Sequence, residues 1–239
     1  MKQISVYKIT FFMQSPLALT SPLHFDGLLT AVHPAMHNTT TPTRYDKNIP
    51  IIDAPLPLCN IRSRNRWVWG CTAAEFPDDA KLAQDSMTKR RTPQDIFNAM
   101  RSFLPGSGAM KDRFSTFQVV LTPYIYFFAA TAELKELTRL IKRIQNIGGK
   151  RKSGYGIISK FEIEPVNATI KDLLILDGNA RRNLPFVFCN NDINNTKMIP
   201  CNSPYWHPTN VEQGIEVGDP IKLAENIEYY YGRGEHYAI

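Results

Sequence analysis

The stretch ELKELTRLIKRIQNIGGKRKSGYG, residues 133–156, is the one on which the expected fold depends. Its first part predicts an amphipathic helix from Glu133 to Ile147, because apolar residues recur at helical spacing along one side. The apolar stripe consists of Leu134, Leu137, Leu140, Ile141, Ile144 and Ile147. Gly148 is well placed to end the helix in a left-handed conformation. Alternation of apolar and polar residues then predicts a strand at about 155–164.

The same patterns predict the other elements of the first two thirds of the chain. Strands are expected at about residues 3–14, 67–74 and 114–131, with a helix at about 24–33 and a Pro- and Thr-rich loop at 38–60. The order β, α, β, β, α, β is that of a ferredoxin-like domain, in which two helices cover one face of an antiparallel sheet. The sequence therefore predicts an α+β fold of the ferredoxin-like (RRM-like) kind.

We expect two parts in the chain. Residues 1–166 form the predicted main domain, with a long basic insertion at about 76–113 between two of its strands. Residues 167–239 form a loop-rich, aromatic extension that packs on the main domain, and the end of this extension is acidic.

Composition favours an ordered protein with an anionic partner. Of the 239 residues 43% are hydrophobic and 21% charged, and the formal charge is +6 with a pI near 9.1. The N-terminal segment lacks the uninterrupted apolar run of a secretory signal, and no stretch approaches the length of a membrane span. These features predict a cytoplasmic protein without membrane contact.

Four cysteines, Cys59, Cys71, Cys189 and Cys201, form two pairs with the same spacing of twelve and no Cys-x-x-Cys. Buried, reduced thiols explain the pattern, since two such pairs are not a usual zinc motif. A zinc ion that joins the two pairs remains the alternative.

The turn after the second helix, GGKRKSGYG at 148–156, places three consecutive cations between two pairs of glycines. Glycines that only end a helix and admit a strand explain it without a ligand. Exposed amides and cations would also suit the phosphates of a bent nucleic-acid strand, with an aromatic ring for base stacking. The RNA-contacting residues of this hypothesis are Gly148, Gly149, Lys150, Arg151, Lys152, Ser153, Gly154 and Tyr155. A nucleotide cofactor is not expected, because the turn follows a helix instead of preceding one.

On these residues the chain resembles the RAMP superfamily of CRISPR-associated RNA-binding proteins, whose main signature is a glycine-rich turn at this place in a ferredoxin-like domain. Further segments are similar to the small RAMP subunit of type IV CRISPR effectors, which belongs to the Cas-five group. These segments are SPLHFDGLL at 21–29, GAMK at 108–111, RNLP at 182–185 and PYW at 204–206.

The resemblance implies a subunit of a Cascade-like, RNA-guided effector complex that caps the 5′ handle of the guide RNA (crRNA) and helps to assemble the complex for DNA targeting. The implied partners are the crRNA handle, the large subunit, the backbone RAMP subunits, and target DNA beside the short motif (PAM) that marks it. The resemblance also implies that the insertion is a thumb-like β-hairpin with Lys89, Arg90 and Arg91 near its tip. His24 and Lys111 complete the implied RNA contacts.

A metal-independent ribonuclease that processes CRISPR repeat RNA is the alternative, because some RAMP proteins cut RNA with a histidine as general acid or base. His33 and His37 lie near the first predicted helix, where such a residue is expected. No second acid–base group stands at a telling spacing. The sequence therefore favours a binding subunit with no catalytic residue, no cofactor and no metal.

Overall fold

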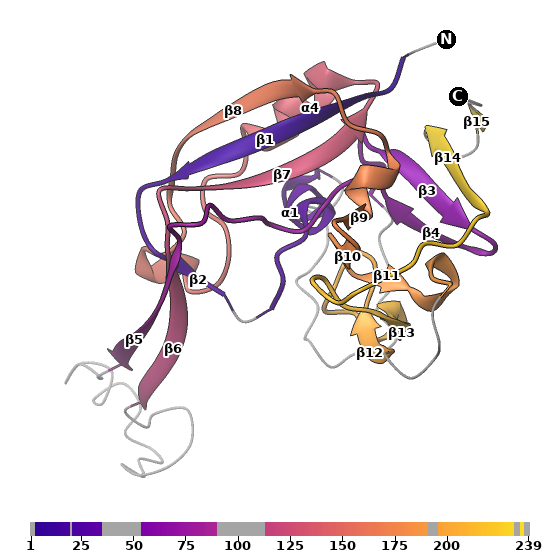
Figure 1. Ribbon diagram of the computed structural model, residues 1–239. Coiled ribbons are helices and arrows are strands. Elements are labelled where there is room, and N and C mark those ends of the chain that lie inside the picture. The colour runs from indigo at the N-terminus through magenta and orange to yellow at the C-terminus, as the bar shows by residue number, and fades with distance from the viewer. Residues whose placement is uncertain are drawn as a thin grey trace, which may run out of the picture.

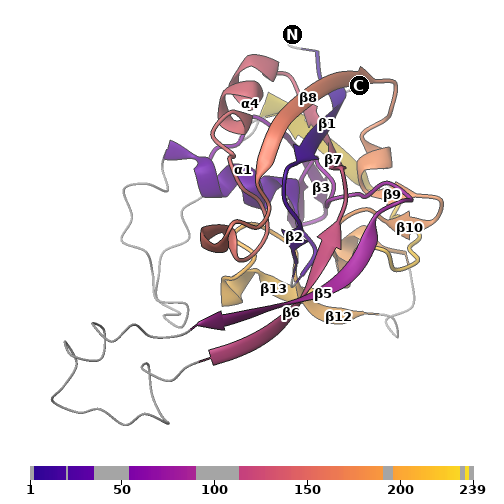
Figure 2. The ribbon, with the colours of Figure 1, turned by 90° about the vertical axis from the view of Figure 1, so that its left-hand side faces the viewer.

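A three-stranded antiparallel sheet in the order β7-β1-β8, called the central sheet below, runs across the upper part of Figure 1. The structure is a computed structural model that describes residues 3–19, 21–34, 54–89, 113–190, 196–231 and 235–236. The strands of the central sheet are β1 (Ser5–Met13), β7 (Tyr124–Thr131) and β8 (Ile158–Val166). The helices α1 (Phe25–Val32) and α4 (Leu134–Ile141) lie on one side of this sheet (Figure 2).

The first hydrophobic core lies between the central sheet and the two helices. Odd-numbered residues of β1 and β7 point into it, because successive side chains of a strand alternate between two faces. Ile9, Phe11, Ile125 and Phe127 are fully buried there. Phe127 packs against Phe25 of α1 with ring centroids 5.2 Å apart. Burial of each such side chain stabilises the fold by about 1.5–3 kcal/mol, so this contact holds α1 on the sheet.

A two-stranded ribbon, the β5–β6 ribbon, projects from the body of the molecule (Figures 1 and 2). It consists of β5 (Lys81–Lys89) and β6 (Arg113–Leu121), and β2 (Leu17–Ala18) pairs with β6 at its base. Of the two strands, β5 lies within the insertion expected at 76–113 and β6 begins at its last residue, while residues 90–112 lie outside the described part of the chain.

The single strand predicted at 114–131 is wrong, because the chain divides there into β6 and β7. Pro123 lies between the two strands and lacks the N–H that an uninterrupted ladder would use. Thr122 supports the break, since its hydroxyl donates a hydrogen bond to the carbonyl of Tyr124 at 2.6 Å. One half of the predicted strand therefore belongs to the ribbon and the other to the central sheet.

A second sheet joins the C-terminal part of the chain to the middle part. It has the order β15-β14-β3-β4 and consists of β3 (Cys59–Ser63), β4 (Arg66–Trp69), β14 (Ile227–Tyr231) and β15 (Glu235–His236). Ile61 and Val68 of this sheet pack against Leu173 and Phe188 in a second core. Residues after 166 thus share a core with β3 and β4.

The rest of the C-terminal part is built from short elements. These are β9 (Ile175–Leu176), β10 (Asn179–Ala180), β11 (Leu184–Pro185), β12 (Lys197–Pro200) and β13 (Val211–Ile215), with 3-10 turns at Lys171–Leu173, Phe186–Phe188 and Pro208–Asn210. β9 pairs with β10, and β13 lies between β11 and β12. All of these pairings are antiparallel.

The predicted α+β, ferredoxin-like βαββαβ fold is wrong. The structure is mostly β, with 46% strand and 16% helix, and its described residues form two α-helices and several small antiparallel sheets. The segment expected as a strand at 67–74 is divided between β4 and isolated bridges, Cys71 to Ala129 and Glu75 to Tyr126, along the edge of β7. Periodicity located the elements but did not indicate that they divide among several sheets.

The second predicted helix is shorter than its apolar stripe. α4 ends at Ile141, and the amides of Arg143 and Ile144 donate to carbonyls only three residues earlier, at 3.0 and 2.9 Å. These tighter turns still direct Ile144 and Ile147 into the first core. The stripe predicted burial correctly from Leu137 to Ile147, whereas Leu134 at its start is exposed. Regular α-helix covers only the first half of the stripe.

A buried ion pair connects the N-terminal helix to the C-terminal part. The guanidinium of Arg182 and the carboxylate of Asp26 in α1 are both fully buried, with Nη2 and Oδ2 3.4 Å apart. Tyr205 bridges them, because its hydroxyl accepts from Arg182 at 3.0 Å and donates to Asp26 at 2.9 Å. The guanidinium also donates to the carbonyls of Trp69, Cys71 and Cys201. This Arg182 network satisfies both charges inside the protein.

Replacing Arg182 with methionine is expected to lower the free energy of unfolding by about 3–5 kcal/mol, because Asp26 would be buried without its cation. Arg66→Ala is the matched control: Arg66 pairs with Glu212 at 2.8 Å, but its side chain is 51% exposed. That control is expected to cost less than about 1 kcal/mol. Urea unfolding measures both variants, and equal losses would contradict a structural role for the buried pair.

Candidate nucleic-acid interface

The glycine-rich turn, residues 148–156, is closed by backbone hydrogen bonds at its base. The amide of Ile147 donates to the carbonyl of Gly156 at 2.9 Å, and that of Ile158 donates to Gln145 at 3.1 Å. Between these bonds lies a single 3-10 turn, Arg151–Ser153. The turn is therefore a closed, ordered loop between α4 and β8.

Two glycines of the turn are required by its geometry. Gly148 and Gly156 have φ values of +77° and +69°, which residues with a Cβ rarely adopt. A Cβ on Gly148 would lie 2.6 Å from the carbonyl oxygen of Ala18, and one on Gly156 would lie 1.9 Å from that of Ile147. Chain folding alone thus explains these two glycines.

Several amides of the turn are already used within the protein. Those of Gly149 and Gly156 donate to the carbonyls of Ala18 and Pro16, at 2.7 and 2.8 Å. Those of Ser153 and Gly154 donate within the turn itself. For these four groups, the expectation that backbone amides face an anion is wrong.

The side chains of the turn's cations face solvent. Lys150, Arg151, Lys152 and Ser153 are all exposed, and Lys150 is itself in the left-handed conformation, with φ of 53°. The Nζ of Lys150 lies 5.0 Å from the ring centroid of Phe117 on β6. The turn thus presents three adjacent positive charges from a fixed backbone, which is the arrangement that suits a phosphate chain.

Tyr155 fastens the turn to the β5–β6 ribbon. Its hydroxyl donates to the Asp85 carboxylate of β5 at 2.6 Å, and its ring meets that of Phe117 edge-on, with centroids 5.2 Å apart. The hydrogen bond from Tyr155 holds the pKa of Asp85 below its ordinary value. Ser153 adds a contact, Oγ to Sδ of Met87, at 3.6 Å. Tyr155, predicted to stack on a base, instead packs against the protein.

A pocket of about 320 Å³ lies beside the turn. Gly148, Gly149 and Arg151 line one side of it, and Leu28 of α1 and Tyr205 line another. Its position joins the exposed cations to an apolar hollow at the N-terminal helix. A nucleic-acid strand on the turn would have this hollow within reach.

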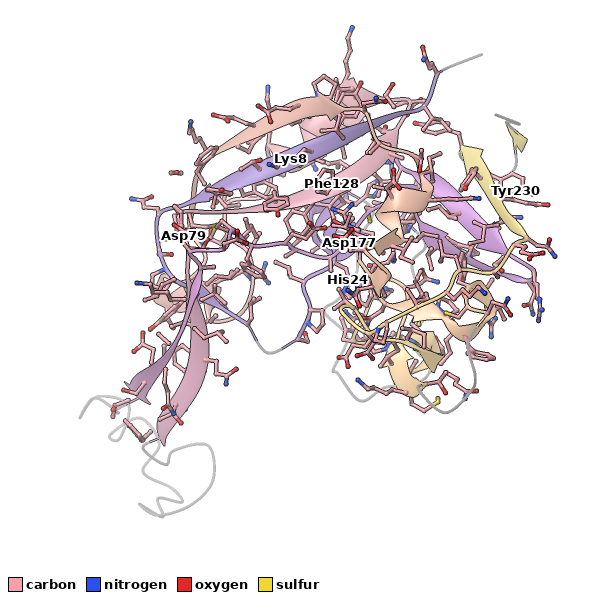
Figure 3. The ribbon with its side chains drawn as sticks, viewed as in Figure 1. Lys8, His24, Asp79, Phe128, Asp177 and Tyr230 are labelled. Atoms are coloured by element: carbon pink, nitrogen blue, oxygen red, sulfur yellow. The ribbon has the colours of Figure 1, made fainter. Side chains whose placement is uncertain are left out.

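His24, predicted to contact RNA, is buried instead. Only 4% of it is exposed, and its ring stacks on Tyr205 with centroids 4.2 Å apart. Its Nε2 accepts a hydrogen bond from the backbone amide of Asn183 at 3.1 Å. Because this nitrogen is an acceptor, it carries no proton, and the imidazole is neutral. Burial lowers the pKa of His24 to about 4. Figure 3 shows its place in the interior of the molecule, where it supports the Arg182 network.

The other predicted site residues are distributed as follows. Lys89 ends β5, and Arg90, Arg91, Lys111 and His37 lie outside the described residues. His33 follows α1 and is half-buried near α4, where burial lowers its pKa and Glu136 opposes that shift. The described structure therefore does not bring His33 into the glycine-rich turn.

The cysteines behave as the simpler hypothesis predicts. Cys59, Cys71 and Cys201 are buried, Cys189 is partly buried, and all four are reduced. Burial raises the pKa of Cys59, Cys189 and Cys201 to about 12, so these thiols stay protonated. Within the ranges that the structure describes, no three His, Cys, Asp or Glu side chains are grouped as metal ligands.

Comparison with known proteins adds no family. No protein-family model matches the chain, and no curated protein matches its sequence. Among the described residues, no helix is both long and apolar enough to cross a bilayer.

Three segments that suggested the resemblance meet in one place. Residues 21–29 supply His24 and Asp26, residues 182–185 supply Arg182, and residues 204–206 supply Tyr205. Sequence reasoning missed this network, because a lone Arg and a lone Asp 156 positions apart give no periodic signal. These motif residues stabilise the fold around the turn instead of forming an exposed site.

Acid is expected to destabilise the protein through His24. A histidine whose pKa falls from 6.5 to about 4 on folding binds its proton more tightly when unfolded, so stability is lost as the pH falls between these values. The loss amounts to roughly 3 kcal/mol at pH 4. His24→Gln keeps an acceptor for Asn183 and removes the titration. Urea unfolding at pH 7 and pH 4 should show a smaller acid loss in the variant; identical losses would refute this role.

Proposed function

We propose that the protein is an RNA-binding subunit of a type IV CRISPR effector complex that holds the 5′ handle of the crRNA on its glycine-rich turn. The observation that carries the proposal is the run of exposed cations, Lys150 to Lys152, on a turn whose conformation the protein itself fixes. Preorganised charges bind a polyanion without the cost of ordering a loop.

The surroundings of the turn support this assignment. Tyr155, Asp85 and Phe117 tie the turn to the middle of the described ribbon, so an RNA strand on the turn would have the ribbon beside it. The formal charge of +6 is consistent with an anionic partner. The ribbon matches in position the thumb-like insertion that the resemblance implies.

The remaining assignments belong to the same proposal. The protein acts in the cytoplasm, contacts the large subunit and the backbone RAMP subunits, and lies close to the PAM of the target DNA. It binds RNA as a structural cap and carries no catalytic residue of its own. The proposed role involves no cofactor bound to this chain.

Replacing Lys150, Arg151 and Lys152 together with alanine is expected to weaken binding of single-stranded RNA that carries the repeat-derived 5′ handle. Each lost phosphate contact lowers the salt dependence, so the slope of log K against log salt should fall by about 2 in magnitude. The control replaces three exposed cations outside the turn with alanine: Arg64, Lys171 and Lys222. Fluorescence anisotropy at several salt concentrations measures both proteins.

Equal affinity and equal slope in the turn variant and the wild type would overturn the proposal. The ribonuclease alternative is tested with the same RNA, incubated with the purified protein in a metal chelator. Cleavage at one position that is lost on His33→Ala would replace the binding assignment with a catalytic one.

A further inference from the structure

The face of the central sheet turned away from α1 and α4 carries a row of aromatic rings. Phe12 of β1 and Tyr124, Tyr126 and Phe128 of β7 are all half-buried, and we call these four rings the aromatic face. Successive centroids are 6.0, 6.4 and 5.8 Å apart, from Phe12 through Tyr124 and Tyr126 to Phe128. Figure 3 shows Phe128 and Lys8 on this sheet.

The first core does not use these rings, although Phe128, at the far end of the row, packs against the second core. The opposite faces of the same strands already supply the buried side chains, and a solvent-facing side of an antiparallel sheet is ordinarily polar. Here cations lie against three of the rings: Lys160 against Phe12 at 4.2 Å, Lys8 against Tyr126 at 4.5 Å and Arg181 against Phe128 at 4.3 Å. The combination of rings and cations is that of surfaces that bind unpaired nucleic acid.

The net charge of this face is small. Lys160 pairs with Glu162 at 2.6 Å, and Arg181 pairs with Glu75 at 2.6 Å. Glu164 lies opposite Lys8 across the strands. A ligand on the aromatic face would therefore be held mainly by stacking, in contrast to one on the cationic turn.

One end of the aromatic face adjoins the glycine-rich turn. Across the sheet, Phe12 lies between Tyr124 and Lys160, at the end where the next residue of β1 pairs with the start of β8. Two residues before the start of β8, the amide of Gly156 bonds to Pro16. An RNA strand that leaves the turn would therefore reach the rings of Phe12 and Tyr124 without crossing the core.

We propose that the aromatic face is a base-stacking surface for the single-stranded RNA that leaves the glycine-rich turn. This inference rests on the proposed function, because the turn supplies the neighbouring phosphate contacts. β7 rises about 7 Å from Tyr124 to Tyr126, and Phe12 lies beside Tyr124, so these three rings offer places for about two bases. Aromatic stacking accepts any base, so the surface lengthens the bound strand without reading its sequence.

The test uses oligouridylates of about 6 and about 12 nucleotides, because the longer strand alone should cover both the turn and the aromatic face. The double variant Tyr124→Leu, Tyr126→Leu is expected to bind the longer strand at least about fivefold more weakly, with an unchanged salt slope. Tyr124→Phe, Tyr126→Phe keeps both rings and should bind as the wild type. Trp206→Leu, which removes an aromatic side chain that is 42% exposed elsewhere, is the control.

The two proposals fail in different ways. If the leucine variant, shown to be folded by its thermal melt, binds the longer strand as the wild type does while the turn variant loses affinity, the aromatic face is not an RNA surface. If the leucine variant binds the longer strand normally but no longer binds a protein subunit of the complex, the aromatic face is a contact surface for that subunit. If the turn variant also binds normally, the proposed function itself is wrong.

Discussion

The buried pair of Arg182 and Asp26 joins the first helix to the C-terminal part of the chain. Two opposite charges with no exposed surface are tolerated only where each is satisfied, and here Tyr205 and backbone carbonyls complete the set. The pair fixes the start of α1 against the C-terminal part of the chain. His24, two residues before Asp26, is buried by the same packing. The pocket beside the glycine-rich turn therefore has walls drawn from both ends of the sequence.

Different residues of the glycine-rich turn set its shape and carry its exposed charge. Gly148 and Gly156 have positive φ values and approach neighbouring carbonyls too closely for a Cβ, and Tyr155 anchors the turn to the ribbon. The residues between them, Lys150 to Lys152, make up its exposed, charged part. Exposed cations on a turn that the protein itself fixes would suit a ligand with a regular array of negative charge. The neutral aromatic face next to it would contribute the complementary, salt-independent part of binding.

Local patterns predicted the elements better than their arrangement. The strand expected at 3–14 is β1, and the predicted stripe is buried from Leu137 to Ile147, because both follow from periodic burial of one face. The ferredoxin-like topology failed, since Pro123 divides a long apolar run between two sheets. The Arg182 network and the role of Tyr155 depend on contacts between residues far apart in sequence. Such contacts leave no periodic signal that a single sequence could show.

Photo-cross-linking tests whether RNA binds to the glycine-rich turn and the aromatic face. Single-stranded RNA with 4-thiouridine at successive positions is cross-linked to the intact protein, and the modified peptides are identified by mass spectrometry. Adjacent nucleotides are expected to cross-link to the turn at 148–156 and then to the peptides that contain Phe12 and Tyr124. Cross-links confined to other surfaces, such as the turn between β3 and β4, would contradict it.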